Sequence, residues 1–159
     1  LGLKVGPSAN PKEIIEVIKA LNPKNEEGRI TLITRFGHDK VDAGLPKIVA
    51  AVQEAQQHVV WSVDPMHGNA IKTSDNVKTR SFDHILAELT KTITVHRQSH
   101  THLGGVHFEL TGDNVTECIG GSQGLGPEDL SKNYETYCDP RLNYSQSLEM
   151  SFLISNLIK

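Results

Sequence analysis

The sequence has few of the residue types that mark specialised classes of protein. Only two of its 159 residues are cysteines, Cys118 and Cys138, so at most one internal disulfide can form and a disulfide-stabilised scaffold is excluded. No apolar run reaches the roughly 18 to 20 residues that a membrane span needs. Lys and Arg number 16 against 19 Asp and Glu, and no basic run of five occurs, so an electrostatic footprint for nucleic acid is missing. We expect no nucleic-acid partner, no membrane partner, and a reducing location, which is the cytoplasm, or the plastid if the chain is of plant origin.

The start of the chain also lacks the usual signals. There is no initiator methionine, and no charged segment followed by an apolar one, as in a secretory signal peptide. The first residues, 1–5, already have the pattern of a buried strand. We therefore expect the chain to be a fragment of a longer polypeptide.

Four short apolar runs alternate with longer segments of helical period. The predicted strands are 1–5, 30–34, 58–63 and 104–110. The predicted helices are 10–22, 41–57, 81–98 and 145–158. The first helix has the clearest boundaries, because Asn10-Pro11 is a capping pair and Asn22-Pro23 ends the apolar period. Since no linker interrupts the four βα units, residues 1–159 are expected to form a single segment with a parallel sheet.

Two architectures fit four βα units, the open doubly wound sheet and the (β/α)₈ barrel. A reactive side chain lies at or just after the end of each predicted strand: Lys4, Arg35, His67 and Glu109. Such residues converge at the carboxyl end of a barrel, whereas an open sheet usually has a glycine-rich phosphate turn, which this sequence lacks. A complete barrel takes about 250 residues. The expected fold class is therefore α/β, with four βα units forming half of a (β/α)₈ TIM barrel.

Three of the polar residues form a set that could hold a metal ion. His67 lies between Pro65, which restricts the backbone before it, and Gly68, which gives the backbone freedom after it. Glu109 and Asp139 follow in later segments. One nitrogen and two carboxylates suit a divalent ion such as Mn²⁺, Co²⁺, Fe²⁺ or Zn²⁺. Each residue also has a simpler interpretation, as a histidine in a surface turn, a solvated glutamate, or an aspartate in an Asp-Pro turn.

Lys4 and Arg35 would add two positive charges beside this set. Ammonium and guanidinium groups suit an anionic substrate with phosphate or carboxylate groups. The alternative is a pair of solvated cations at strand ends. Cys118 and His107 are interpreted mainly as structural.

Six sequence strings resemble a known family, the class II 3-deoxy-D-arabino-heptulosonate 7-phosphate (DAHP) synthases. They occur in the family's order and extend over nearly the whole chain. The strings are Leu3-Lys4-Val5-Gly6-Pro7, Thr34-Arg35-Phe36-Gly37, Asp64-Pro65-Met66-His67-Gly68-Asn69, the segment 104–112, Thr116-Glu117-Cys118-Ile119-Gly120-Gly121, and the segment 134–143.

The resemblance implies a metal-dependent (β/α)₈ barrel of which this chain is the C-terminal half, the last four βα units. It implies condensation of phosphoenolpyruvate with erythrose 4-phosphate, the first step of the shikimate pathway. His67, Glu109 and Asp139 are implied as metal ligands, with Mn²⁺ or Co²⁺ expected before Zn²⁺ or Fe²⁺. Lys4 and Arg35 are implied to bind phosphoenolpyruvate, and Lys4 and His67 to be catalytic, Lys4 by assisting proton transfer.

The sequence departs from the family pattern where the barrel would begin. The family's fourth ligand, an early cysteine, has no counterpart, because Cys118 and Cys138 both match late positions. The chain alone is therefore expected to be inactive, and its uncovered sheet edges predict association into a homo-oligomer or with the missing N-terminal half-barrel. Two alternatives remain: a catalytically silent structural fragment that associates with itself, and another phosphoenolpyruvate-using barrel.

Overall fold

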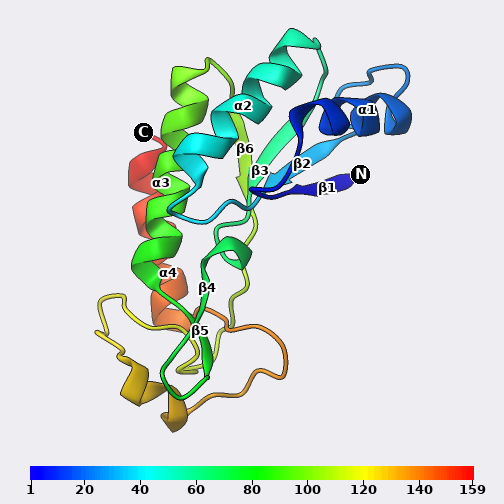
Figure 1. Cartoon of the computed structure of the whole chain (residues 1–159). Helices are drawn as coiled ribbons and strands as arrows, with labels where there is room; N and C mark the ends of the chain where they lie inside the picture. Colours follow the sequence, from blue (N-terminus) through cyan, green and yellow to red (C-terminus); the bar gives the residue numbers. More distant parts are fainter.

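The computed structural model describes residues 1–159, and the upper part of Figure 1 shows a four-stranded parallel sheet packed against helices. The strands of this sheet are β1 (Gly2–Val5), β2 (Thr31–Thr34), β3 (Val60–Val63) and β6 (Leu103–Val106). They pair in the order β1-β2-β3-β6, so each strand lies beside its successor in the chain. The predicted α/β class and the parallel sheet are confirmed.

Four helices connect or follow these strands. They are α1 (Pro11–Leu21), α2 (Val41–Glu54), α3 (Phe82–Gln98) and α4 (Tyr144–Leu157), each within a few residues of its predicted position. Local sequence explains the helix starts: the side chain of Asn10 accepts the backbone N–H of Lys12, and Asn143 caps α4 by accepting that of Gln146. No helix combines the length and the apolar composition that a membrane crossing needs.

The helices that pack on the sheet cover one of its faces. Alternate strand residues such as Val5, Leu32 and Trp61 are buried in a cluster with side chains of α1, α2 and α3. The opposite face, with Lys4 and Ile33, contains no buried residue in β1, β2 or β3. Doubly wound sheets have helices on both faces, so one-sided coverage and sequential strand order are consistent with part of a (β/α)₈ barrel.

A second group of elements lies beyond the carboxyl ends of the strands (Figure 1). It contains the short helices η1 (His67–Asn69) and η2 (Pro127–Lys132) and an antiparallel hairpin of β4 (Ala70–Lys72) and β5 (Lys78–Arg80). The sequence did not predict the hairpin, because three-residue strands are too short for a period to be recognised.

The predicted strand 104–110 was too long. The backbone N–H of His107 still bonds to the carbonyl of Val63, but β3 then runs into Asp64-Pro65, and proline cannot extend the ladder. The chain therefore leaves the sheet at Val106, and Glu109 lies in the following loop.

Candidate metal centre

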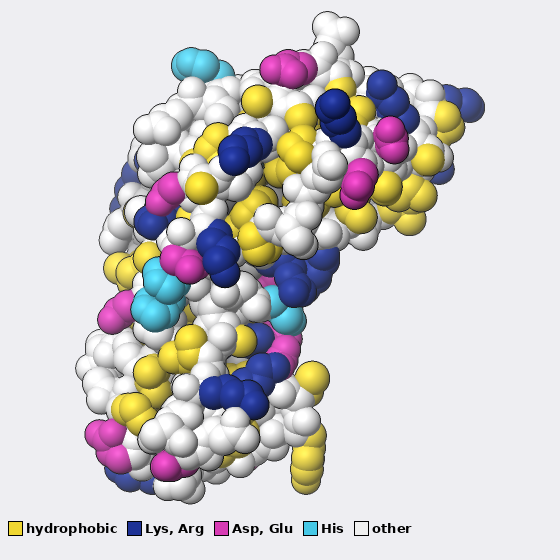
Figure 2. Space-filling view, in the orientation of Figure 1, with side chains coloured by type: hydrophobic (Ala, Val, Ile, Leu, Met, Phe, Trp, Pro, Cys, Tyr) yellow, Lys and Arg dark blue, Asp and Glu magenta, His cyan; other side chains and the backbone are white.

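His67, Glu109 and Asp139 come together at the carboxyl ends of the strands. His67 opens η1 directly after β3, Glu109 follows β6, and Asp139 lies in the loop before α4. The His67 Nε2 atom lies 3.3 Å from Glu109 Oε1 and 3.4 Å from Asp139 Oδ2, and the three donor atoms lie within 4.8 Å of one another. Figure 2 shows basic, acidic and histidine side chains gathered on the concave side of the molecule. The structure thus brings together all three predicted ligands.

Asp64 determines how the His67 ring is presented. Its fully buried carboxylate accepts hydrogen bonds from His67 Nδ1 at 2.6 Å and Lys4 Nζ at 2.7 Å, and from the backbone N–H groups of Met66 and His67. Burial alone would raise the pKa of Asp64, but the hydrogen bond from Lys4, followed by that from the His67 backbone, outweighs burial and lowers the pKa below its usual value. The ionised carboxylate therefore makes Nδ1 the donor and turns the Nε2 lone pair toward Glu109 and Asp139.

This arrangement fits a divalent cation. With Nδ1–H bonded to Asp64, the Nε2 atom of His67 faces two carboxylate oxygens, one of Glu109 at 3.3 Å and one of Asp139 at 3.4 Å. A cation among them satisfies all three. Ligand atoms each about 2.1 Å from one ion lie roughly 3 to 4 Å apart, which agrees with the 3.3 and 3.4 Å separations. The nitrogen and carboxylate donors suit Mn²⁺, Co²⁺, Fe²⁺ or Zn²⁺.

Two cations of β5 hold the carboxylates. The fully buried guanidinium of Arg80 donates to Glu109 Oε2 and to the Pro140 carbonyl, and its Nη2 lies 3.3 Å from Asp139 Oδ2. Lys78 donates to the other oxygen of Asp139. The hydrogen bond from Lys78, more than any other contact, lowers the pKa of Asp139. The β4–β5 hairpin, which the sequence does not predict, therefore orients two of the three candidate ligands.

A buried glutamate fixes the loop that carries Asp139. The fully buried Glu117 side chain accepts the backbone N–H groups of Glu135, Thr136 and Arg141, and also Arg141 Nε at 2.9 Å and Nη2 at 2.7 Å. These bonds hold the loop on both sides of Asp139. They also outweigh burial and lower the pKa of Glu117.

The structure connects one of the two predicted substrate-binding cations to this cluster. Lys4 reaches it through Asp64. Arg35 follows β2, and its backbone N–H bonds to the carbonyl of Val5 on the neighbouring strand. Its partly exposed side chain makes no hydrogen bond or ion pair within the chain.

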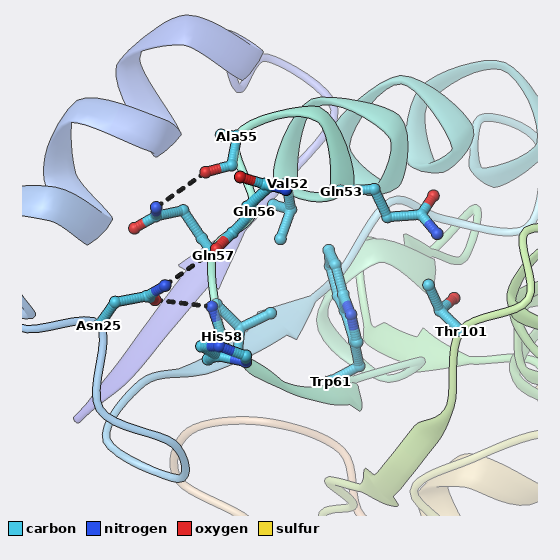
Figure 3. A pocket seen from close by; sticks show the side chains of 10 residues that line it. Asn25, Val52, Gln53, Ala55, Gln56, Gln57, His58, Trp61 and Thr101 are labelled. Atoms are coloured by element: carbon cyan, nitrogen blue, oxygen red, sulfur yellow. Dashed lines mark hydrogen bonds between the residues drawn. The ribbon is translucent and has the colours of Figure 1, made fainter.

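A larger cavity lies away from the cluster. It has a volume of about 710 Å³, and residues near the amino ends of the strands line it, including Asn25, His58, Trp61 and Thr101 (Figure 3). A smaller cavity of about 310 Å³ lies at the other end of the sheet, with Glu109 and Asp139 in its wall. Ligands of parallel α/β folds bind at the carboxyl ends of strands, so the smaller cavity is the one associated with the cluster.

Comparison with known proteins identifies the family. The model of the class-II DAHP synthetase family matches residues 1–155. The chain belongs to this family. It is 47% identical to the phospho-2-dehydro-3-deoxyheptonate aldolase of Neurospora crassa over 98% of the chain and 33% of that relative. It is also 47% identical to the phospho-2-dehydro-3-deoxyheptonate aldolase AroG of Mycolicibacterium smegmatis, over the whole chain and 34% of the relative. The chain thus spans about one third of the length of these curated relatives.

Four residues of the chain support the cluster but were not predicted as part of it. Asp64 could have been found, because an aspartate three residues before a candidate histidine ligand is a typical partner for its second nitrogen. Lys78, Arg80 and Glu117 have no such local signal, since the groups they contact are 61, 29 and 24 residues away.

Proposed function

We propose that this chain is the C-terminal half of the (β/α)₈ barrel of a DAHP synthase and carries most of its metal site. His67, Glu109 and Asp139 would bind the ion, with Mn²⁺ or Co²⁺ preferred. The observation that carries the proposal is the convergence of these three donors beside Lys4. Membership of the class-II DAHP synthetase family supports it. The one-sided helix coverage of the sheet supports the barrel.

The charges of the cluster favour an anionic substrate. Three carboxylates and three cations pair with one another: Asp64, Glu109, Asp139, Lys4, Lys78 and Arg80. Their formal charges cancel, so a bound divalent ion leaves the site positive. A bound ion supplies Lewis acidity toward a carbonyl oxygen. The positive site attracts phosphate and carboxylate groups.

Lys4 and Arg35 have the chemistry that phosphoenolpyruvate requires. The Arg35 guanidinium is free of internal partners and can form two parallel hydrogen bonds to a carboxylate or phosphate. Lys4 Nζ, held at 2.7 Å from Asp64, retains donors for the substrate and can hold or deliver a proton there. The reaction is the condensation of phosphoenolpyruvate, erythrose 4-phosphate and water to DAHP and phosphate.

A second candidate is a structural fragment without catalytic activity. The uncovered sheet face and the unpaired outer edges of β1 and β6 favour it, because such surfaces promote self-association. In that case the chain would form homo-oligomers and bind metal weakly or not at all.

Calorimetric titration with Mn²⁺ tests the proposal. The purified chain is titrated at neutral pH under reducing conditions, with and without phosphoenolpyruvate, beside the His67→Ala variant. We expect binding with one ion per chain that phosphoenolpyruvate strengthens, and a loss of more than about 100-fold in affinity in the variant, since even partners of ligands are worth 10 to 100-fold. Absence of binding, or equal binding by the variant, would refute the ligand assignment and favour the structural fragment.

A further inference from the structure

Glu88 is a buried carboxylate with no ion-pair partner. It lies on α3, its residue is fully buried, and no Lys, Arg or His forms an ion pair with it. Burial raises its pKa, and hydrogen bonds from Gly37, Phe36 and Asn69 oppose that rise. Burying an acidic group costs free energy that an apolar residue of similar volume would not cost. Glu88 therefore needs an explanation other than core stability.

Its two oxygens contact two different loops. Oε1 accepts the backbone N–H of Phe36 at 2.7 Å, in the loop after β2. Oε2 accepts Asn69 Nδ2 at 2.7 Å, in η1 after β3. Each contact is close to a proposed site residue, because Arg35 precedes Phe36 and His67 lies two residues before Asn69.

Asn69 ties the two loops together further. Its Nδ2 also donates to the Pro65 carbonyl at 2.8 Å, within its own loop. Its Oδ1 accepts the backbone N–H of His38, in the loop after β2, at 2.9 Å. Both the oxygen and the nitrogen of the Asn69 amide are therefore hydrogen-bonded. The bond from Nδ2 to Glu88 determines which side of the amide the nitrogen occupies.

The loops also touch backbone to backbone. A Cβ atom at Gly68 would lie 2.4 Å from Gly37 N, and one at Gly37 would lie 2.8 Å from Gly68 O. Real Cβ atoms do not approach so closely, so no other residue fits either position without moving a loop. Gly37 also has a φ of +89°, which favours glycine.

We propose that Glu88 is a positioning residue that locks the Arg35 and His67 loops into one rigid unit. The imidazole of His67 and the guanidinium of Arg35 then keep a fixed distance and orientation relative to each other. This inference rests on the proposed function for the roles of Arg35 and His67, whereas the mechanical coupling of the loops does not.

Glu88→Gln tests the coupling at nearly constant volume. Every group facing the carboxylate is a donor, so a glutamine places its own NH₂ against either Phe36 N–H or Asn69 Nδ2. We expect backbone amides in both loops to exchange hydrogen roughly tenfold faster or more, which corresponds to the loss of about one charge-assisted hydrogen bond. Exchange in the rest of α3 should stay as in the unmodified chain.

Thr92→Val is the matched control. Thr92 lies one turn further along α3, is fully buried, and has a hydroxyl without a hydrogen-bond partner. Its replacement changes the same helix without removing a hydrogen bond to either loop, and exchange in both loops should be unchanged. If Glu88→Gln does not fold, Gly68→Ala disturbs the separate backbone contact between the two loops at Gly37 and should speed exchange in both loops.

Binding and kinetics then show whether the coupling serves the site. Mn²⁺ affinity of the chain and the KM for phosphoenolpyruvate of the full-length protein should both worsen in Glu88→Gln. Faster exchange in only one loop, or throughout α3, would overturn the proposal, as would loosened loops with unchanged affinity and KM. Failure of the unmodified chain to bind Mn²⁺ would instead refute the proposed function, while the exchange data would still decide the coupling.

Discussion

Replacing Glu117 with alanine should both destabilise the chain and weaken its hold on metal. The carboxylate accepts five hydrogen bonds, three from Arg141 and one each from the backbone of Glu135 and Thr136. The Glu117→Ala variant leaves Arg141, which is only 30% exposed, without its counter-ion, and three loop N–H groups without an acceptor. Because Asp139 lies within this loop, its carboxylate should lose its fixed position as well.

The size of the effect follows from the burial of the pair. Removing one partner of a buried ion pair typically costs about 3 to 5 kcal/mol. For a chain of this length that corresponds to a fall in Tm of roughly 10 °C. Urea unfolding followed through the fluorescence of Trp61, the single tryptophan and only 5% exposed, measures the free energy of unfolding. Glu26→Ala, which removes a half-exposed pair with Arg29, is the control and should change stability little.

The pH dependence provides a second test of the same variant. The pKa of Glu117 is lower in the folded chain, so its contribution is complete above its unfolded value of about 4.5 and is lost as pH falls through the folded value. The unmodified chain should lose this increment in acid, and Glu117→Ala should not. A variant within about 1 kcal/mol of the unmodified chain at neutral pH, the range of an exposed pair, with unchanged Mn²⁺ affinity, would refute the reasoning.

Three further outcomes are expected. In the full-length protein, His67→Ala should abolish metal-dependent turnover, and normal activity in a steady-state assay would remove His67 from the ligands. Arg35→Ala should raise the KM for phosphoenolpyruvate roughly tenfold to hundredfold, as expected for a lost charged hydrogen-bonding partner; unchanged kinetics would exclude Arg35 from the site. Burial, followed by the charge of His102, lowers the pKa of His96 to about 4. Neutral His96 thus stabilises the fold fully above its unfolded pKa near 6.5, and urea unfolding should show a progressive loss of stability, about 3 kcal/mol in all, between pH 6.5 and 4. His96→Asn should lack this loss, and identical pH profiles for the two chains would contradict the assignment.

The regular elements could be predicted because their signals are local. Asn10 and Pro11 mark a helix start by themselves, and β-strands of apolar residues between helical segments indicate parallel pairing. The end of β6 could not be predicted, since it depends on Asp64-Pro65 in the neighbouring strand. The β4–β5 hairpin was missed because its short strands have no recognisable period.

The three candidate ligands could be predicted for a similar reason, since they follow strand ends or a recognisable motif. Apart from Asp64, the residues that hold them in place could not be predicted. Arg80 is a cation on a short strand, and Glu117 is an acidic residue beside a cysteine; neither pattern indicates burial. Only the folded chain shows that Arg80 is enclosed between Glu109 and Asp139.

Each candidate ligand is held by a different partner, and this determines how changes in the chain should act on metal binding. Asp64 orients His67, Arg80 holds Glu109, and Glu117 fixes the loop of Asp139. Because each partner holds its ligand through hydrogen bonds within the chain, less ordering of the ligands is left to metal binding. A substitution in β5 or at Glu117 should therefore lower metal affinity while every ligand is still present. The loss of affinity in such a variant measures how much of the affinity depends on the partners that hold the ligands.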